Sequence, residues 1–508
     1  MLRTLAAMCL LVTLVGCDED PPPIDTGPPP PPRTDSGPFV CPDPALPAPP
    51  TPGPALDRPT ELVLDRDTAD GSTVVAFDAD AVAEDARFDL GVQAGSIRRT
   101  SARLWTHATA MDPITLRVWR DDGDEVRLAN ETTVTPVDGG YVLMTVEGLA
   151  PATGYRYAFF VGTTPDFTGR STVGRFTTAI PEGTEAHLRV AATTCTNQAR
   201  APFESLSWMA EQDVDLFVQL GDMVYNDGAR TRAEFRSSWR SALSDPGYLA
   251  MLSNAGAYYT WDDHEIIDSG GYYDIPESVR QAGTDAFYEN LPVEPVDRDG
   301  SRSFWNAYPW GDSVEFIVLD ARSERQVATR ETPDAEYLSE AQLSFLFDRL
   351  ENSPARFKVV LNSVPITRFP LPLWGFQDDR WQGYDAQRTR LVDFIAERNV
   401  RDVVFLTGDF HLGFVARIEP EGAGHNVWEV AVGPGDSRSR NPVPALVSGG
   451  VITGEEGFPC AQFAYFDGAT RAATLLDFDS MQGTLRVQFI EPVSENVLFD
   501  GVLFDDAE

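Results

Sequence analysis

Residues 214–225 read VDLFVQLGDMVY, a nearly continuous apolar run that stops at Gly221 and Asp222. A short apolar run bounded by turn residues predicts a buried strand, and the acidic residue directly after it lies at the carboxyl end of that strand. The arrangement recurs in AYYTWDDHE (257–265), where an apolar run ends in three acidic residues around His264. Carboxylates packed this closely repel one another unless a positive group lies among them. The two stretches therefore predict a cation at the ends of these strands.

From residue 186 to residue 508, apolar runs alternate with segments of helical periodicity. The predicted strands include HLRVAATTC (187–195), SVEFIVLDAR (313–322), RFKVVLNSVPI (356–366) and DVVFLTGDF (402–410). The predicted helices SEAQLSFLFDRLEN (339–352) and QRTRLVDFIAERN (387–399) lie between strands. Strands that alternate with helices predict a layered α/β domain.

Residues 59–180 have a different pattern, in which short apolar runs recur between turn residues. Examples are ITLRVWRDD (114–122) and YRYAFFVG (155–162). This spacing predicts a small antiparallel β-sandwich, immunoglobulin-like or fibronectin-like, ahead of the α/β domain. We expect no catalytic cluster there, because His107 stands alone.

Residues 1–17 resemble a bacterial lipoprotein signal, because Arg3 precedes a short apolar run and the run ends in LVGC at Cys17. Cys17 would then be the lipidated residue. The alternative is an ordinary secretory signal, and either signal takes the protein out of the cytoplasm. Residues 18–58 are rich in proline and predict a semi-stiff tether. We expect the protein in a bacterial cell envelope, lipid-anchored and either periplasmic or outward-facing.

The charge of the chain limits its partners. Acidic residues outnumber basic residues 78 to 40, and the formal net charge is -38 over 508 residues. This charge argues against a nucleic-acid-binding surface and against adsorption to an anionic membrane, so we expect membrane contact only through the lipid anchor. A small phosphoester substrate remains compatible with this charge, because bound metal ions reverse the local field.

Five predicted strands end at residues that can bind metals. The candidate ligands are Cys195, Asp222 with Tyr225, Asp263 beside His264, Asn362, and Asp409 with His411. Ligands of open α/β sheets bind beyond the carboxyl ends of the strands, where all of these residues are expected. Each motif alone is a weak signal, whereas five in succession favour a metal centre.

The motifs GDMVY (221–225), DDHE (262–265) and GDFH (408–411) occur in an order that resembles the calcineurin-like metallophosphatase superfamily. More narrowly, the chain resembles the alkaline phosphatase D (PhoD-like) family, and the resemblance extends to FDLGVQAGSIRRTSARLWTHA (88–108) and WQGYDAQRTRLVDFI (381–395). The resemblance implies an α/β/β/α metallophosphatase core preceded by the β-sandwich, and two metals bridged by Asp222. EIIDSGG (265–271) is less typical of the family and leaves the choice of substrate open.

The donor atoms divide the ligands into two sets. Cys195 and Tyr225 offer a thiolate and a phenolate, which suit Fe³⁺ and which His411 can complete. Asp263, Asn362 and Asp409 offer oxygen atoms, with Asp222 shared. Oxygen ligands suit Ca²⁺, with Mg²⁺ or Mn²⁺ as alternatives, and disfavour Zn²⁺.

The predicted mechanism uses the metals to neutralise the phosphate oxygens and to generate a hydroxide nucleophile for in-line displacement. His264 is the predicted catalytic residue, which stabilises the transition state and protonates the leaving oxygen. Asp262 and Glu265 are expected to orient the ligand loop and His264, although Asp262 could instead be a solvated loop acid.

The resulting hypothesis is a secreted or envelope-anchored metal-dependent phosphoesterase that hydrolyses monoesters, diesters or both. The alternatives are a phospholipase-like or nucleotide-directed phosphodiesterase with the same site, and an inactive surface-binding lipoprotein. The natural substrate and the oligomeric state stay open.

The cysteines give one further prediction. We expect Cys9 to be lost with the signal and Cys17 to be acylated, which leaves Cys41, Cys195 and Cys460, an odd number for an oxidising compartment. If Cys195 binds iron, Cys41 and Cys460 can form a disulfide that joins the tether to the catalytic domain. Cys41 could alternatively pair between molecules.

Overall fold

The structure, a computed structural model, describes residues 39–40, 71–122, 125–266, 272–298, 300–369, 380–436, 459–468 and 470–504. The chain divides into two units, residues 1–36 and 37–508, and the first unit lies wholly outside the described residues. The predicted signal, Cys17 and most of the predicted tether therefore fall outside the description. Within the described ranges, no helix is long and apolar enough to cross a membrane.

A mixed sheet of nine strands carries the first half of the predicted metal ligands. Its order is β25-β24-β23-β11-β12-β13-β3-β4-β7, and β11, β12, β13 and β3 run parallel. The strands are β3 (Val92–Gly95), β4 (Ser101–His107), β7 (Tyr141–Glu147), β11 (His187–Thr193), β12 (Leu216–Leu220), β13 (Gly256–Thr260), β23 (Ala473–Asp479), β24 (Thr484–Ile490) and β25 (Val497–Val502). Every residue of β12 and β13 is buried, as their continuous apolar runs predict.

A second mixed sheet, of eight strands, carries the other ligands. Its order is β1-β22-β20-β21-β19-β18-β17-β16, and β17, β18, β19 and β21 run parallel. The strands are β1 (Phe39–Val40), β16 (Asn306–Trp310), β17 (Val314–Val318), β18 (Phe357–Leu361), β19 (Val403–Thr407), β20 (Gly413–Arg417), β21 (Trp428–Ala431) and β22 (Phe463–Asp467).

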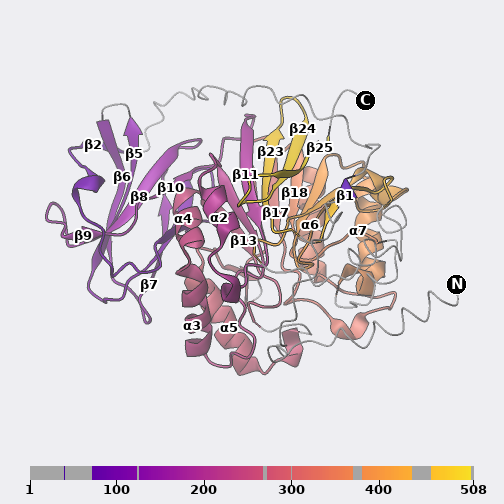
Figure 1. Cartoon of the computed structure of the whole chain (residues 1–508), viewed down its shortest axis with the longest axis horizontal. Coiled ribbons are helices and arrows are strands. Elements are labelled where there is room, and N and C mark those ends of the chain that lie inside the picture. The colour runs from indigo at the N-terminus through magenta and orange to yellow at the C-terminus, as the bar shows by residue number, and fades with distance from the viewer. Residues whose placement is uncertain are drawn as a thin grey trace, which may run out of the picture. The chain divides into compact units, whose positions relative to one another are not determined.

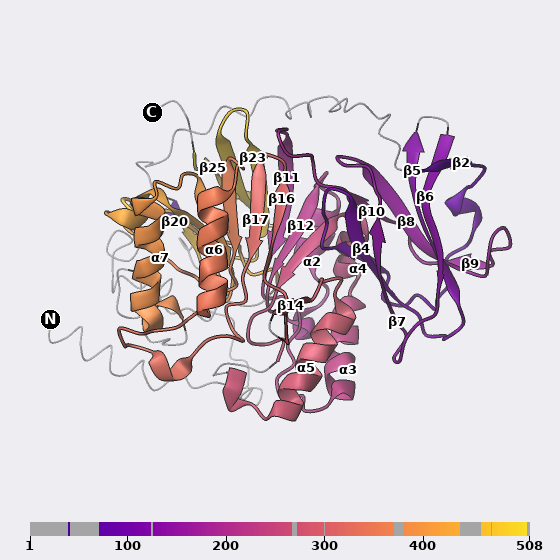
Figure 2. The ribbon, with the colours of Figure 1, turned by 180° about the vertical axis from the view of Figure 1, so that it is seen from behind.

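The two sheets pack on each other through alternate residues of their strands. In β17, Phe316 and Val318 belong to the large core that also contains the nine-stranded sheet, whereas Ile317 belongs to a second core. That second core includes Leu346 of α6 and Leu391 of α7. Figure 2 shows α6 and α7 side by side along this sheet. The helices are α2 (Glu204–Ala210), α3 (Arg232–Leu243), α4 (Pro246–Asn254), α5 (Glu277–Asn290), α6 (Glu340–Asn352) and α7 (Asp385–Glu397).

The N-terminal region contains the predicted antiparallel β-structure. A six-stranded sheet has the order β10-β8-β5-β6-β2, with β9 beside β8. Its strands are β2 (Thr73–Val75), β5 (Ile114–Asp122), β6 (Glu125–Val134), β8 (Gly154–Val161), β9 (Gly169–Arg170) and β10 (Gly174–Thr177), seen at one end of the molecule in Figure 1. Leu116 and Val118 of β5 share a core with Leu104 of β4, so this sheet packs on the β3-β4-β7 end of the nine-stranded sheet.

This arrangement joins the N-terminal region to the strands that carry the predicted ligands by backbone pairing. β3 pairs in parallel with β13, with Ala94 opposite Gly256 and Gly95 opposite Ala257. The side chain of Gln93 then links Tyr259 Oη at 3.0 Å to the carbonyl of Asn290 at 3.0 Å. The predicted sandwich and α/β regions are therefore parts of one compact unit.

One strand forms inside the predicted tether. β1 (Phe39–Val40) pairs with β22, with Phe39 opposite Phe466 and Val40 opposite Tyr465. Cys460, which precedes β22, is disulfide-bonded. Cys41, its predicted partner, lies outside the described residues.

Candidate metal centre

The predicted ligands lie where strands of both sheets end. Cys195 follows β11, Asp222 follows β12, Asp262 and Asp263 follow β13, Asn362 follows β18, and Asp409 and His411 follow β19. Thr260 Oγ1 donates to the carbonyl of Leu319, just beyond β17, at 2.8 Å, which connects the two sheets at this edge. The carboxyl ends of the parallel strands thus meet, as expected for a site of this type.

Two glycines let the ligand loops approach one another. A Cβ on Gly221 would lie 2.6 Å from the Cβ of Asp262, and a Cβ on Gly408 would overlap the side chain of Thr194. Only glycine fits at such close approaches of one backbone to a neighbouring loop. The glycine of each GD motif is therefore required by the packing of the ligand loops.

Four of the predicted ligands have left-handed backbone conformations. The φ angles are 54° for Cys195, 53° for Asp222, 63° for Asp409 and 53° for His411. Non-glycine residues adopt this region rarely and at a cost, and such residues cluster at functional sites. The surrounding packing therefore holds these four side chains in place against their own backbone preference.

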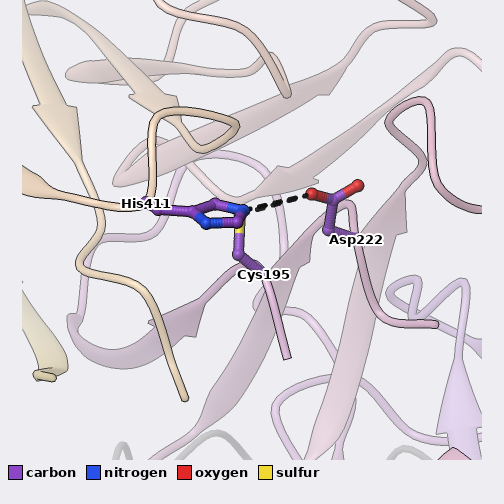
Figure 3. Close-up of side chains that lie close together, drawn as sticks. All are labelled: Cys195, Asp222 and His411. Carbon is purple, nitrogen blue, oxygen red and sulfur yellow. Dashed lines mark hydrogen bonds and ion pairs between the residues drawn. The ribbon is translucent and has the colours of Figure 1, made fainter. Parts of the chain in front are cut away.

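The first cluster contains Cys195, Asp222 and His411, which Figure 3 shows close together. Tyr225 joins this cluster through its hydroxyl group. Asp222 Oδ2 lies 3.5 Å from Cys195 Sγ, 3.2 Å from Tyr225 Oη and 3.9 Å from His411 Nε2. Tyr225 Oη also lies 3.0 Å from His411 Nε2. A thiol, a phenol, an imidazole and a carboxylate therefore converge within the reach of one metal ion.

The second cluster is formed by Asp262, Asp263 and Asp409, which bring one carboxylate oxygen each to within 4.8 Å of the others. Asp263 also belongs to a group with Asp222 and His264 within the same limit. Asp222 of the first cluster therefore lies close to Asp263 of the second cluster.

Asn362 is fully buried at the end of β18, beside the loop of the second cluster. Its neighbour Ser363 donates its hydroxyl to Asp262 Oδ1 at 3.0 Å. Asn362 Oδ1 and Asp222 Oδ1 are buried oxygen atoms for which the described residues provide no hydrogen-bond partner. Buried polar atoms are normally paired. A bound cation would satisfy both oxygens, so these residues fit a metal centre.

The electrostatics of the protein groups also favour a cation. Burial raises the pKa of the Cys195 thiol well above its usual value, and Asp222 raises it further. Burial likewise raises the pKa of Asp262, with Arg322 acting in the opposite direction. A positive ion among these groups would favour their charged forms.

Glu265 fastens the two ligand loops to each other. Its fully buried carboxylate accepts the backbone N–H of Asp222 at 3.1 Å, of Met223 at 2.7 Å and of Asp262 at 2.8 Å. Burial and the charge of Asp222 raise the pKa of Glu265 to about 8, against these hydrogen bonds. All three partners are donors, so the hydrogen bonds favour the carboxylate form. Asp262 is 1% exposed and is therefore not a solvated loop acid.

His264 lies beside the ligands and is oriented by a residue outside the predicted set. Its Nδ1 lies 2.6 Å from Asp227 Oδ1, and its ring lies 4.0 Å from that of Tyr225, centroid to centroid. Burial opposes protonation, but Asp222, Asp263 and Asp227 outweigh it and raise the pKa of His264 to about 11. Asp227 therefore orients His264, rather than Asp262 or Glu265 as predicted.

Sequence reasoning missed three residues of the site: Arg322, Arg380 and Asp227. Arg322 contacts Asp262 and lies 3.0 Å from Asp409 Oδ1, and Arg380 lies 2.7 Å from Asp409 Oδ2. Arg322 follows β17, so its position just after a buried strand was the available signal. No comparable signal marks Arg380 or Asp227 in the sequence.

Comparisons with known proteins identify the relatives of the chain. A family model described as PhoD-like phosphatase matches residues 190–455, and one described as PhoD-like phosphatase, N-terminal domain, matches residues 74–180. Alkaline phosphatase D from Bacillus subtilis (strain 168) is 25% identical over 390 residues, which are 65% of this chain and 65% of that protein. The match thus spans slightly less than two thirds of that relative.

Two solved structures share the fold. A structure of PhoD has a TM-score of 0.68 at 20% identity and covers 82% of this chain and 88% of its own. The purple acid phosphatase PPD1 from yellow lupin (Lupinus luteus) seeds has a TM-score of 0.58 at 12% identity, with 81% of this chain and 73% of its own covered. These two structures support the predicted fold, an α/β core preceded by a β-rich region, and the family models confirm the predicted family.

Proposed function

Because the chain belongs to the PhoD-like phosphatase family, a family of phosphoric ester hydrolases, we propose that it is a metal-dependent phosphoesterase that cleaves phosphate monoesters, diesters or both. The observation that carries this proposal is the convergence of the strand-end ligands into two clusters that are linked where Asp222 of the first lies near Asp263 of the second. Two such clusters suit a two-metal site for phosphoryl transfer. The core would have the α/β/β/α order expected for metallophosphatases, which the two packed sheets and the α6–α7 core support.

The residues divide between the two metals by their chemistry. Cys195, Tyr225 and His411 would hold Fe³⁺, because thiolate and phenolate are strongly donating anions. Asp263, Asn362 and Asp409 would hold Ca²⁺, or alternatively Mg²⁺ or Mn²⁺, through oxygen atoms. Asp222 would bridge the two ions. When bound, the metals would neutralise charge on the phosphate and activate the attacking water.

His264 is the residue of this chain that can move a proton in the reaction. Asp227 holds Nδ1, so Nε2 is the ring nitrogen that can donate to the leaving oxygen. The ring is fixed against Tyr225, which is itself part of the first cluster. A positioned donor of this kind assists departure of a poor leaving group.

The substrate is proposed from charge and chemistry. The net charge of -38 disfavours a polyanionic partner, so a small phosphoester is the proposed substrate. Phospholipase-like and nucleotide-directed diesterase activities remain alternatives for the same site. An inactive surface-binding lipoprotein is less well supported, because each predicted ligand lies at a strand end of the site. Attachment to the cell envelope through Cys17 is part of the proposal and rests on the sequence.

Turnover of two chromogenic substrates, with metal analysis, tests the function. The purified chain should hydrolyse p-nitrophenyl phosphate or bis-p-nitrophenyl phosphate, and the ratio of the two rates gives its preference. Asp222→Asn should depress both activities and lower the metal content, because Asp222 serves both clusters. Wild-type protein that holds two metals and hydrolyses neither ester, nor a phospholipid or nucleotide diester, would support the inactive alternative.

A further inference from the structure

Arg322 lies inside the acidic cluster of the proposed second metal. Its side chain is 6% exposed, and its guanidinium contacts Asp262 through Nε. Its Nη2 lies 3.0 Å from Asp409 Oδ1 and 3.8 Å from Asp263 Oδ1. One fixed positive charge therefore faces all three carboxylates of the cluster.

The fold holds Arg322 in this place. Asp320, which follows β17 and is 2% exposed, accepts the backbone N–H of Arg322 at 3.0 Å and the indole N–H of Trp261 at 2.8 Å. Trp261 directly precedes Asp262. The turn that presents Arg322 is thus tied to the loop that presents the carboxylates, and the arginine is not a mobile surface charge.

The charges of the cluster can be summed. Three ionised carboxylates, from Asp262, Asp263 and Asp409, and one guanidinium leave a net charge of -2. Arg380 adds one positive charge at Asp409 Oδ2, and Asp222 adds one negative charge as the shared ligand. Over these six side chains the two additions cancel, so their net charge remains -2, which is equal and opposite to the charge of a divalent cation.

We propose that Arg322, assisted by Arg380, is a built-in counter-charge that makes the acidic cluster select divalent over trivalent metal ions. This inference rests on the proposed function, because it takes Asp263 and Asp409 as ligands of the second metal. Without Arg322 the same cluster would carry a net charge of -3, and a trivalent ion would become the better match. A nearby unit charge repels a trivalent ion more than a divalent ion at the same position.

Competition between Tb³⁺ and Ca²⁺ tests the proposal on the full chain. Tb³⁺ is close to Ca²⁺ in size and luminesces when a neighbouring aromatic group absorbs, and Trp261 precedes Asp262. After a chelator has removed the exchangeable ion, luminescence titrations with Tb³⁺ and displacement by Ca²⁺ give the ratio of the two affinities. Arg322→Gln and Arg322→Met should shift this ratio toward Tb³⁺ roughly tenfold or more. Arg322→Lys keeps the charge and should stay within about threefold of wild type.

Matched controls separate charge from structure. Arg390→Gln removes an exposed arginine of α7 that pairs with Glu340, and it should leave the ratio unchanged. The proposal would be overturned if folded Arg322→Gln had the same ratio of Tb³⁺ to Ca²⁺ affinity as wild type. It would also be overturned if Arg322→Lys shifted this ratio as much as Arg322→Gln does. If Arg322→Gln does not fold, Arg380→Gln should shift the ratio toward Tb³⁺, and no shift would also overturn it.

Asp409→Asn distinguishes failure of the inference from failure of the proposed function. This variant should abolish the Tb³⁺ signal of the site. If Asp409→Asn removes none of the Tb³⁺ signal of the wild-type protein, the proposed second metal site is wrong. The proposed role of Arg322 is then wrong as well. If the signal is present and only the variant ratios fail, the metal site stands and the counter-charge proposal does not.

Discussion

Replacing Glu265 with glutamine should loosen the metal centre without removing a ligand. Glu265 Oε2 accepts the N–H groups of Asp222 and Asp262, and Oε1 accepts that of Met223. Glutamine has one carbonyl oxygen, which can keep the first two bonds, but its NH₂ group would then face the N–H of Met223. One charge-assisted hydrogen bond is lost and one buried donor is left unpaired. Together these changes should lower the free energy of unfolding by about 2–4 kcal/mol.

The same substitution should also weaken metal binding. Substitution of a residue that orients a metal ligand typically lowers metal affinity roughly tenfold to a hundredfold. Glu265→Gln should therefore retain less metal than wild type at equal chelator concentration and lose activity in proportion. Denaturant unfolding, metal analysis and turnover of p-nitrophenyl phosphate on the same preparations measure the three quantities.

Glu429→Gln is a matched control for this experiment. Glu429 is also fully buried, and it accepts the N–H groups of Ile366 and Thr367 and the hydroxyl of Thr407. None of these three residues is a proposed ligand. Glu429→Gln should lose similar stability and keep its metal. Equal metal loss in both variants, or full metal and activity in Glu265→Gln, would refute the positioning role of Glu265.

Three further predictions follow from the site and the cysteines. His264→Ala should keep both metals, and its rate on alkyl phosphates should fall roughly a hundredfold to ten-thousandfold, with a much smaller loss on p-nitrophenyl phosphate. Parallel Brønsted leaving-group slopes for wild type and His264→Ala at full metal content would contradict the general-acid role. A Ca²⁺ chelator should abolish activity and leave the iron absorption in place, whereas Cys195→Ser should lose the iron and its colour together; recovery of full activity with Zn²⁺ alone would contradict the proposed ligand sets. Non-reducing peptide mapping should find Cys41 joined to Cys460, and finding both as free thiols would remove the proposed disulfide.

The strand ends were predictable because the signal is local. In β12 and β13 a buried apolar run stops at an acidic residue, and burial plus strand direction place that residue at the functional edge of the sheet. The pattern of residues 59–180 likewise predicts β-structure because alternation and turn residues are properties of short segments.

Other features depend on contacts between distant segments and were not predictable. β3 pairs with β13 across more than a hundred intervening residues, and neither strand shows this in its own sequence. Arg322 in LDARSER looks like an ordinary loop charge until Asp262 and Asp409 are placed beside it. The pair Phe39–Val40 lies in a proline-rich stretch whose composition predicts no strand.

The pairing of β3 with β13 also bears on how such a protein can evolve. The loop that carries Asp262, Asp263 and His264 leaves β13 directly, and one edge of β13 is covered by the N-terminal region. A gene fusion that joined residues 186–508 to a different partner would leave that edge open, with unpaired backbone groups that favour aggregation. Recombination at residues 180–186 would therefore be selected against. The N-terminal region and residues 186–508 are therefore expected to be inherited together, even though only residues 186–508 supply the proposed ligands.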